Sequence, residues 1–114
     1  MAAEAEADVL ERLFAVIESR RGRDPKTSYT ARLLADGRGR IARKLGEEAV
    51  EVVVAALTER ERVAAESADL LYHLLVLWAD TGVQPVQVWE ELARRQGISG
   101  IAEKAARGRG GSGD

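Results

Sequence analysis

The sequence predicts an all-α protein: an antiparallel helix hairpin that forms a four-helix-bundle core with a second subunit, flanked by short helices. Two observations predict it. Apolar residues recur at the helical period along most of the chain, and glycine, proline and capping residues separate the periodic segments. A chain of 114 residues can build one modest core. We therefore expect a single all-α domain over 1–107 and a disordered, Gly-rich tail over 108–114.

The expected short helices come first. Apolar residues at three- and four-residue spacing predict an amphipathic helix over 4–20, which an Asp-Pro pair then breaks. Ser28 is placed to cap a short second helix through Leu34. Gly37 and Gly39 are expected to end that helix.

Two long helices should form the hairpin. The first is expected over 40–57, where three consecutive valines are a competing strand signal, but a strand of that length is improbable. The segment 58–61, Thr-Glu-Arg-Glu, has the pattern of a capping box that starts the second long helix, which ends near Asp80. A last helix is expected over 85–95, and the segment 99–107 could add one or two loose turns.

Four carboxylates in the hairpin carry the main chemical signal. Glu48 and Glu51 are three residues apart, as are Glu66 and Asp69, so each pair shares a helix face. From a turn at 58–59, the inner member of each pair lies about 7.5 residues away and the outer member about 10.5, so the pairs can face each other. Clustered anions beside apolar residues are stable only with cations or with protonation, and oxygen ligands favour Mg²⁺ or Mn²⁺. The alternative is a solvated acidic face.

Charged residues near the first acid pair suit a phosphorylated ligand. Arg40 and Lys44 lie on the same helical stripe and could hold a phosphate chain. The alternative for Lys44 is an ion pair with Glu48. Glu47 could orient a water molecule or could be an ordinary exposed glutamate.

Hydroxyl groups gather at the start of the short second helix. Ser28, Tyr29 and Thr30 could bind an anion beside free backbone N–H groups, or could only cap the helix and pack one aromatic ring. His73 follows Asp69 by one turn and is either a core histidine or a residue that supports the metal ligands.

Composition excludes several classes of protein. The net charge of −2, from 17 basic and 19 acidic residues, argues against a general nucleic-acid binder. The absence of cysteine excludes disulfides and thiolate metal sites. We find neither a signal-peptide pattern nor an apolar run that could span a membrane, so we expect a cytoplasmic protein without membrane partners.

The chain resembles the phosphoribosyl-ATP pyrophosphohydrolases of histidine biosynthesis, a family of MazG-like all-α nucleotide pyrophosphatases. The resemblance rests on the pattern E-E-x-x-E followed by E-x-x-D, and on the runs SYTARLL, KLGEEAVEVVVAAL, ADLLYHLLVLW and SGIAEKAAR. It spans roughly residues 8 to 107.

The resemblance implies Mg²⁺-dependent hydrolysis of the α–β anhydride of phosphoribosyl-ATP by a homodimer. It implies roles for the following residues: metal ligands Glu48, Glu51, Glu66 and Asp69; Glu47 activating water; Lys44 and Ser28, Tyr29 and Thr30 contacting the substrate. The number of metal ions and the roles of Arg40 and Arg43 stay open. Two other functions also stay open: a house-cleaning pyrophosphatase of non-standard nucleoside triphosphates, and a non-enzymatic helical interaction module.

Overall fold

The computed structural model describes residues 8–96, and these residues are all-helical, as the sequence predicts. The helices are α1 (Val9–Ser19), α2 (Tyr29–Asp36), α3 (Arg38–Thr58), α4 (Val63–Thr81) and α5 (Pro85–Gln96), with a short 3₁₀ turn at Arg60–Arg62. The segment 99–107 and the expected tail lie outside the described residues. The chain divides into two compact units, Met1–Val83 and Gln84–Asp114.

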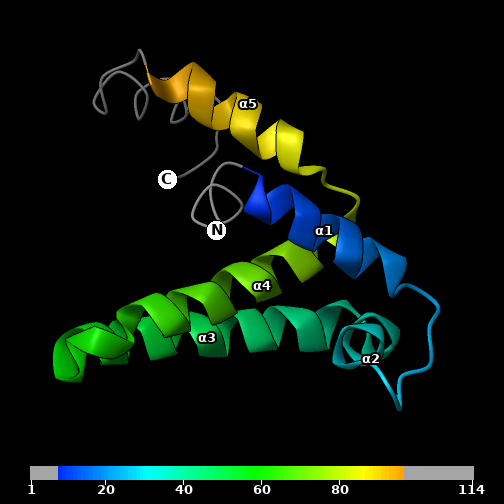
Figure 1. Ribbon diagram of the computed structural model, residues 1–114, viewed down its shortest axis with the longest axis horizontal. Coiled ribbons are helices and arrows are strands. Elements are labelled where there is room, and N and C mark those ends of the chain that lie inside the picture. The colour runs from blue at the N-terminus through cyan, green and yellow to red at the C-terminus, as the bar shows by residue number, and fades with distance from the viewer. Residues whose placement is uncertain (1–7, 97–114) are drawn as a thin grey trace. The chain divides into compact units, whose positions relative to one another are not determined.

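Helices α3 and α4 lie side by side and antiparallel in the first unit, which confirms the helix hairpin (Figure 1). Helices α1 and α2 pack at the end of the hairpin that is remote from its connection (Figure 1). The buried core lies at that end and joins all four helices; its members are Phe14, Ile17, Leu33, Ile41, Leu75, Val76 and Ala79. The connection end of the hairpin therefore has little core beneath it.

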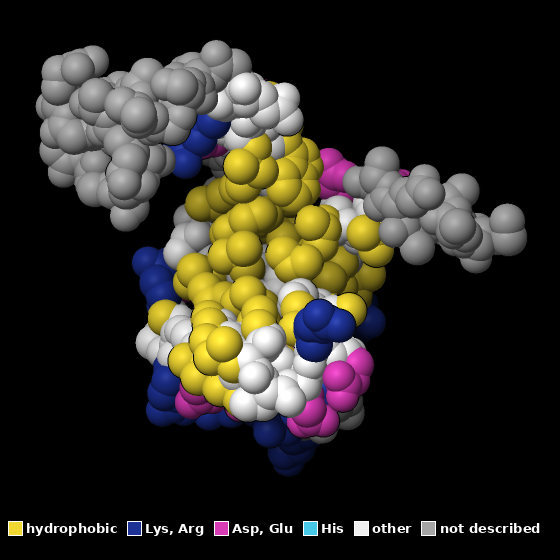
Figure 2. Space-filling view, turned by 90° about the vertical axis from the view of Figure 1, so that its left-hand side faces the viewer, with side chains coloured by type: hydrophobic (Ala, Val, Ile, Leu, Met, Phe, Trp, Pro, Cys, Tyr) yellow, Lys and Arg dark blue, Asp and Glu magenta, His cyan; other side chains and the backbone are white. Residues whose placement is uncertain are grey.

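The hairpin keeps many apolar side chains on its surface. Figure 2 looks toward the hairpin connection and shows hydrophobic side chains gathered on this face, with charged side chains along its lower edges. The exposed apolar residues of α3 and α4 are Val50, Val53, Val54, Leu57 and Leu71, and Leu57 is 80% exposed. An uncovered apolar surface of this kind is typical of a face that meets another protein surface.

The connection between α3 and α4 differs from the expected capping box. Helix α3 continues through Thr58, whose hydroxyl donates to the Val54 carbonyl at 2.7 Å. Thr58 therefore does not cap the helix that follows. A 3₁₀ turn follows, and α4 begins only at Val63 with no side-chain cap. The prediction was wrong because the threonine hydroxyl bonds back into its own helix, a competing option for Thr near a helix end.

Glycines set two of the other helix ends. Gly37 has φ of 100° and separates α2 from α3 by itself, because α3 starts at Arg38. Gly39 therefore lies inside α3, and its expected role in ending the second helix was wrong. Gly82 has φ of 81° and closes α4 close to the end expected near Asp80, with the Val83 N–H donating to the Trp78 carbonyl at 2.9 Å.

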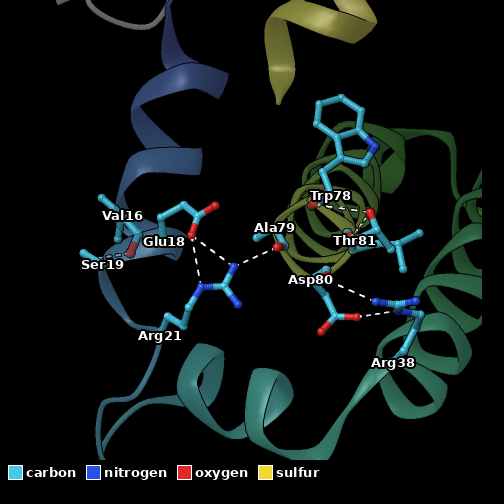
Figure 3. A network of polar contacts seen from close by, with 10 residues as sticks. Val16, Glu18, Ser19, Arg21, Arg38, Trp78, Ala79, Asp80 and Thr81 are labelled. Carbon is cyan, nitrogen blue, oxygen red and sulfur yellow. Dashed lines mark hydrogen bonds and ion pairs between the residues drawn. The ribbon is translucent and has the colours of Figure 1, made fainter. Parts of the chain in front are cut away.

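Two arginines hold the last turn of α4 (Figure 3). Arg21, just after α1, donates to the Ala79 carbonyl at 2.7 Å and to Glu18 at 3.0 Å. Arg38, at the start of α3, donates from Nε to Asp80 Oδ2 at 2.7 Å. These side chains satisfy a carbonyl that the helix end leaves unpaired and place positive charge where the helix dipole is negative.

The described part of the second unit is helix α5. The backbone N–H of Gln84 donates to the side chain of Gln87 at 2.7 Å, and Pro85 occupies the first helical position. Arg94 and Arg95 both hydrogen-bond Glu91 and lower the pKa of its carboxyl to about 2. None of the helices among residues 8–96 has the length and apolar character needed to cross a membrane.

Candidate metal centre

Three carboxylates meet across the hairpin. Glu48 of α3 and Glu66 and Asp69 of α4 each offer an oxygen, and these atoms all lie within 4.8 Å of one another. The sequence count places Glu48 level with Asp69, and the structure brings those two together. Ligand oxygens across an octahedral Mg²⁺ lie about 4 Å apart, so a modest contraction of this cluster fits such an ion.

Glu51 does not belong to this group. It lies one turn after Glu48 on α3, but its side chain is exposed. Exposure alone does not exclude Glu51, because Asp69 is exposed as well and still belongs to the cluster. The role of Glu51 as a metal ligand, which the resemblance implies, stays a prediction.

The carboxylates differ in their surroundings. The Glu66 side chain is only 12% exposed, whereas Asp69 is exposed. Arg62 forms a close ion pair with Glu66 and a longer one, at 3.4 Å, with Glu59. These hydrogen bonds, first to Glu59 and then to Glu66, raise the pKa of Arg62. The cluster thus combines oxygen ligands for a hard cation with a neighbouring guanidinium group.

The basic residues on α3 have partners outside the cluster. Lys44 Nζ lies 3.3 Å from Glu47 Oε1, and Arg43 lies 3.9 Å from the same carboxylate. The ion pair formed by Lys44 is therefore with Glu47 rather than with Glu48. Arg40 lies 3.3 Å from Asp36, and its buried Nε has no hydrogen-bond partner among the described residues.

The hydroxyl residues of α2 act as caps and as contacts to α4. Ser28 caps α2 by accepting from the Ala31 N–H at 3.1 Å. Thr30 forms a short hydrogen bond with the Tyr72 hydroxyl. The Tyr29 hydroxyl lies 3.4 Å from Nε2 of His73, which is only 6% exposed. The cap expected at Ser28 is confirmed, and the contact of these residues with a ligand stays a prediction.

Two features of the site were missed in the sequence. Arg62 lies four residues before Glu66, a spacing that permits a helical ion pair, but the expected capping box drew attention to its neighbours instead. The contact between Tyr29 and His73 joins α2 to α4 over a long stretch of chain. Periodicity within one segment contains no signal for such a contact.

Comparisons with known proteins agree with the site. A family model described as phosphoribosyl-ATP pyrophosphohydrolase matches residues 10–96. A phosphoribosyl-ATP pyrophosphatase of Paramagnetospirillum magneticum is 63% identical over 103 residues, covering 90% of this chain and 94% of the relative. Relatives with the same name occur in Rhodospirillum rubrum, at 65% identity over 88% of this chain and 86% of the relative, and in Azospirillum brasilense, at 59% over 89% and 92%.

Proposed function

The chain belongs to the phosphoribosyl-ATP pyrophosphohydrolase family, and from this premise we propose that it hydrolyses the α–β phosphoanhydride of phosphoribosyl-ATP. The products are phosphoribosyl-AMP and pyrophosphate, and the reaction is a step of histidine biosynthesis. The observation that carries the proposal is the cluster of three carboxylates across the hairpin, in a chain whose relatives are named for this activity.

We propose that Glu48, Glu66 and Asp69, joined by Glu51, hold Mg²⁺, or Mn²⁺ in its place. A bound divalent ion would neutralise charge on the phosphate oxygens and lower the pKa of a coordinated water. Glu51 would join the other ligands through a change of side-chain rotamer, because its exposed carboxylate lies one turn from Glu48. The three clustered acids already lie close enough together to form the rest of the ligand set.

Glu47 and Lys44 form the catalytic pair of the proposal. The Glu47 carboxylate would accept a proton from the attacking water. The oxygen of that water bonds to the α-phosphorus while the α–β phosphoanhydride bond breaks. Lys44 lies 3.3 Å from that carboxylate, so it both orients Glu47 and places a positive charge beside the reacting phosphates. The pyrophosphate group leaves with the electrons of the broken bond.

The rest of the substrate would extend toward α2. Ser28, Tyr29 and Thr30 lie at the start of that helix, and Tyr29 is largely exposed although its hydroxyl contacts His73. Arg40 already pairs with Asp36, and we propose that a substrate phosphate competes for its guanidinium group. The adenine and the second ribose phosphate need a longer cleft than one helix hairpin offers, which supports a homodimeric enzyme whose second subunit covers the exposed face of α3 and α4.

The test is pyrophosphate release from phosphoribosyl-ATP by the purified chain with Mg²⁺, with EDTA as the control. Release that requires the divalent ion supports the proposal. Rapid release from a non-standard nucleoside triphosphate, with none from phosphoribosyl-ATP, would instead identify a house-cleaning pyrophosphatase. No release from either substrate would favour a helical interaction module.

A further inference from the structure

Arg62 is in direct contact with the acidic cluster. Its Nη2 donates to Glu66 in a close ion pair, and its Nη1 lies 3.4 Å from Glu59. The nearby Lys44 and Arg43 are paired with Glu47 instead. The guanidinium group therefore bridges one carboxylate inside the cluster and one outside it.

Glu66 needs such a partner. Its side chain is only 12% exposed, so water hydrates its charge poorly, and two further carboxylate oxygens lie within 4.8 Å. Poor hydration and the repulsion between neighbouring carboxylates both raise the free energy of the cluster. A guanidinium group on one oxygen offsets both.

We propose that Arg62 is the counter-ion of the cluster formed by Glu48, Glu66 and Asp69 when no divalent ion is bound, and that a bound ion displaces it from Glu66. The inference rests on the metal-binding role proposed for the cluster. A divalent ion on Glu66 would repel the adjacent guanidinium charge. The displaced guanidinium group would keep Glu59 as an ion-pair partner, because Arg62 already lies 3.4 Å from that carboxylate.

This role gives Arg62 opposite effects on the two states of the protein. It stabilises the metal-free protein by neutralising repulsion within the cluster. It lowers the affinity for the metal, because the ion must compete with a cation that is already present. A residue that only orients Glu66 for the metal would have the reverse effect on affinity, so the two roles can be separated by the sign of the change.

The experiment is calorimetric titration of the full chain with Mn²⁺, for wild type, Arg62→Ala and Arg60→Ala. Arg60 lies at the start of the same 3₁₀ turn, so its loss changes the net charge equally without removing the ion pair to Glu66. We expect Arg62→Ala to bind Mn²⁺ about two- to ten-fold more tightly than Arg60→Ala, in keeping with a partly exposed ion pair. In EDTA, Arg62→Ala should unfold at a lower temperature than Arg60→Ala.

Equal or weaker Mn²⁺ binding by Arg62→Ala would overturn the role of Arg62 while leaving the metal site in place. If neither wild type nor the variants bind Mn²⁺, the metal-binding role of the cluster fails and the inference fails with it. Arg62→Gln keeps most of the aliphatic stem and removes only the charge, so it replaces the alanine variant if truncation unfolds the start of α4. It should show the same sign of change in affinity.

Discussion

The Tyr29 hydroxyl lies 3.4 Å from Nε2 of His73. The other ring nitrogen, Nδ1, lies 2.8 Å from the backbone carbonyl of Asp69. A carbonyl only accepts, so Nδ1 donates to Asp69, and Nε2 faces the tyrosine hydroxyl. The start of α2 is thereby fixed to the turn of α4 that carries one of the clustered acids.

Replacing Tyr29 with phenylalanine should affect substrate binding more than folding. The lost hydrogen bond should lower the free energy of unfolding by about 0.5–1.5 kcal/mol. We expect KM for phosphoribosyl-ATP to rise while kcat changes little, because Tyr29 is proposed to contact the substrate. Steady-state kinetics measures both. Thr81→Val is the control, since the Thr81 hydroxyl donates to the Leu77 carbonyl within α4 and is assigned no substrate contact; an equal rise in KM there would contradict the prediction.

Glu51→Gln tests whether the exposed glutamate completes the metal site. We expect the variant to fold normally and to lose about 10- to 100-fold in Mg²⁺ affinity or activity, because one charged ligand is replaced by a neutral one. Glu66→Gln should lose at least as much. Glu61, an exposed acid in the hairpin connection, supplies the matched control as Glu61→Gln. Full activity and unchanged metal affinity in Glu51→Gln would leave the site with three carboxylates.

A charge on the exposed hairpin face should separate the proposed dimer. Val53 on α3 is 57% exposed, so Val53→Glu costs little in a monomer but would bury a charge in an interface. We expect wild type to show a dimeric mass by light scattering at micromolar concentration and the variant to show a monomeric mass. Val16→Glu, on α1 at a similar exposure, is the control and should stay dimeric. A monomeric wild type contradicts the prediction.

Gly46 and Gly82 should respond in opposite directions to alanine. Gly46 lies inside α3, and an added Cβ there meets nothing within 4 Å, so Gly46→Ala should stabilise the protein by about 0.5–1 kcal/mol. Gly82 has φ of 81°, which strains any L side chain, so Gly82→Ala should destabilise it by about 1–2 kcal/mol. Thermal unfolding of both variants beside wild type measures the two signs, and a loss of stability in Gly46→Ala would contradict the first.

Alkaline pH should weaken the fold through Tyr72. Burial is the main cause that raises the pKa of this phenol above its usual 10.0, against the opposing effect of the hydrogen bond with Thr30. Because the folded-state pKa is the higher one, the stabilisation is complete below about pH 10 and is lost as the pH rises through the folded value. The unfolding temperature should therefore drop less between pH 8 and pH 11 in Tyr72→Phe than in wild type. An equal fall in both would assign the loss to other groups.

The sequence predicted the helices well, because apolar spacing and the residues that begin or end a helix both act within a single segment. The cap at Ser28 is where the sequence places it, and α4 ends one residue beyond the expected Asp80. The start of α4 was missed because Thr58 had two hydrogen-bonding options, and only the fold decides between them.

The sequence predicted how far along the hairpin the acidic residues lie, but not which way each side chain points. Counting from the turn placed Glu48 level with Asp69, and those side chains do meet. The same counting paired Glu51 with Glu66, yet Glu51 is exposed and is not among the clustered acids. The direction in which a side chain leaves α3 depends on which residues that helix buries against its neighbours, including Ile41 in the core, and so depends on tertiary packing.

The two ends of the hairpin are held differently. Arg21 and Arg38 bind the final turn of α4, whereas the end at the connection has a 3₁₀ turn and little core. Asp69 lies about 16 Å along α4 from Asp80, where Arg38 binds. Thermal unfolding should therefore begin at the connection and proceed toward the carboxylates. An ion bound by both helices there would connect α3 to α4 at a second place.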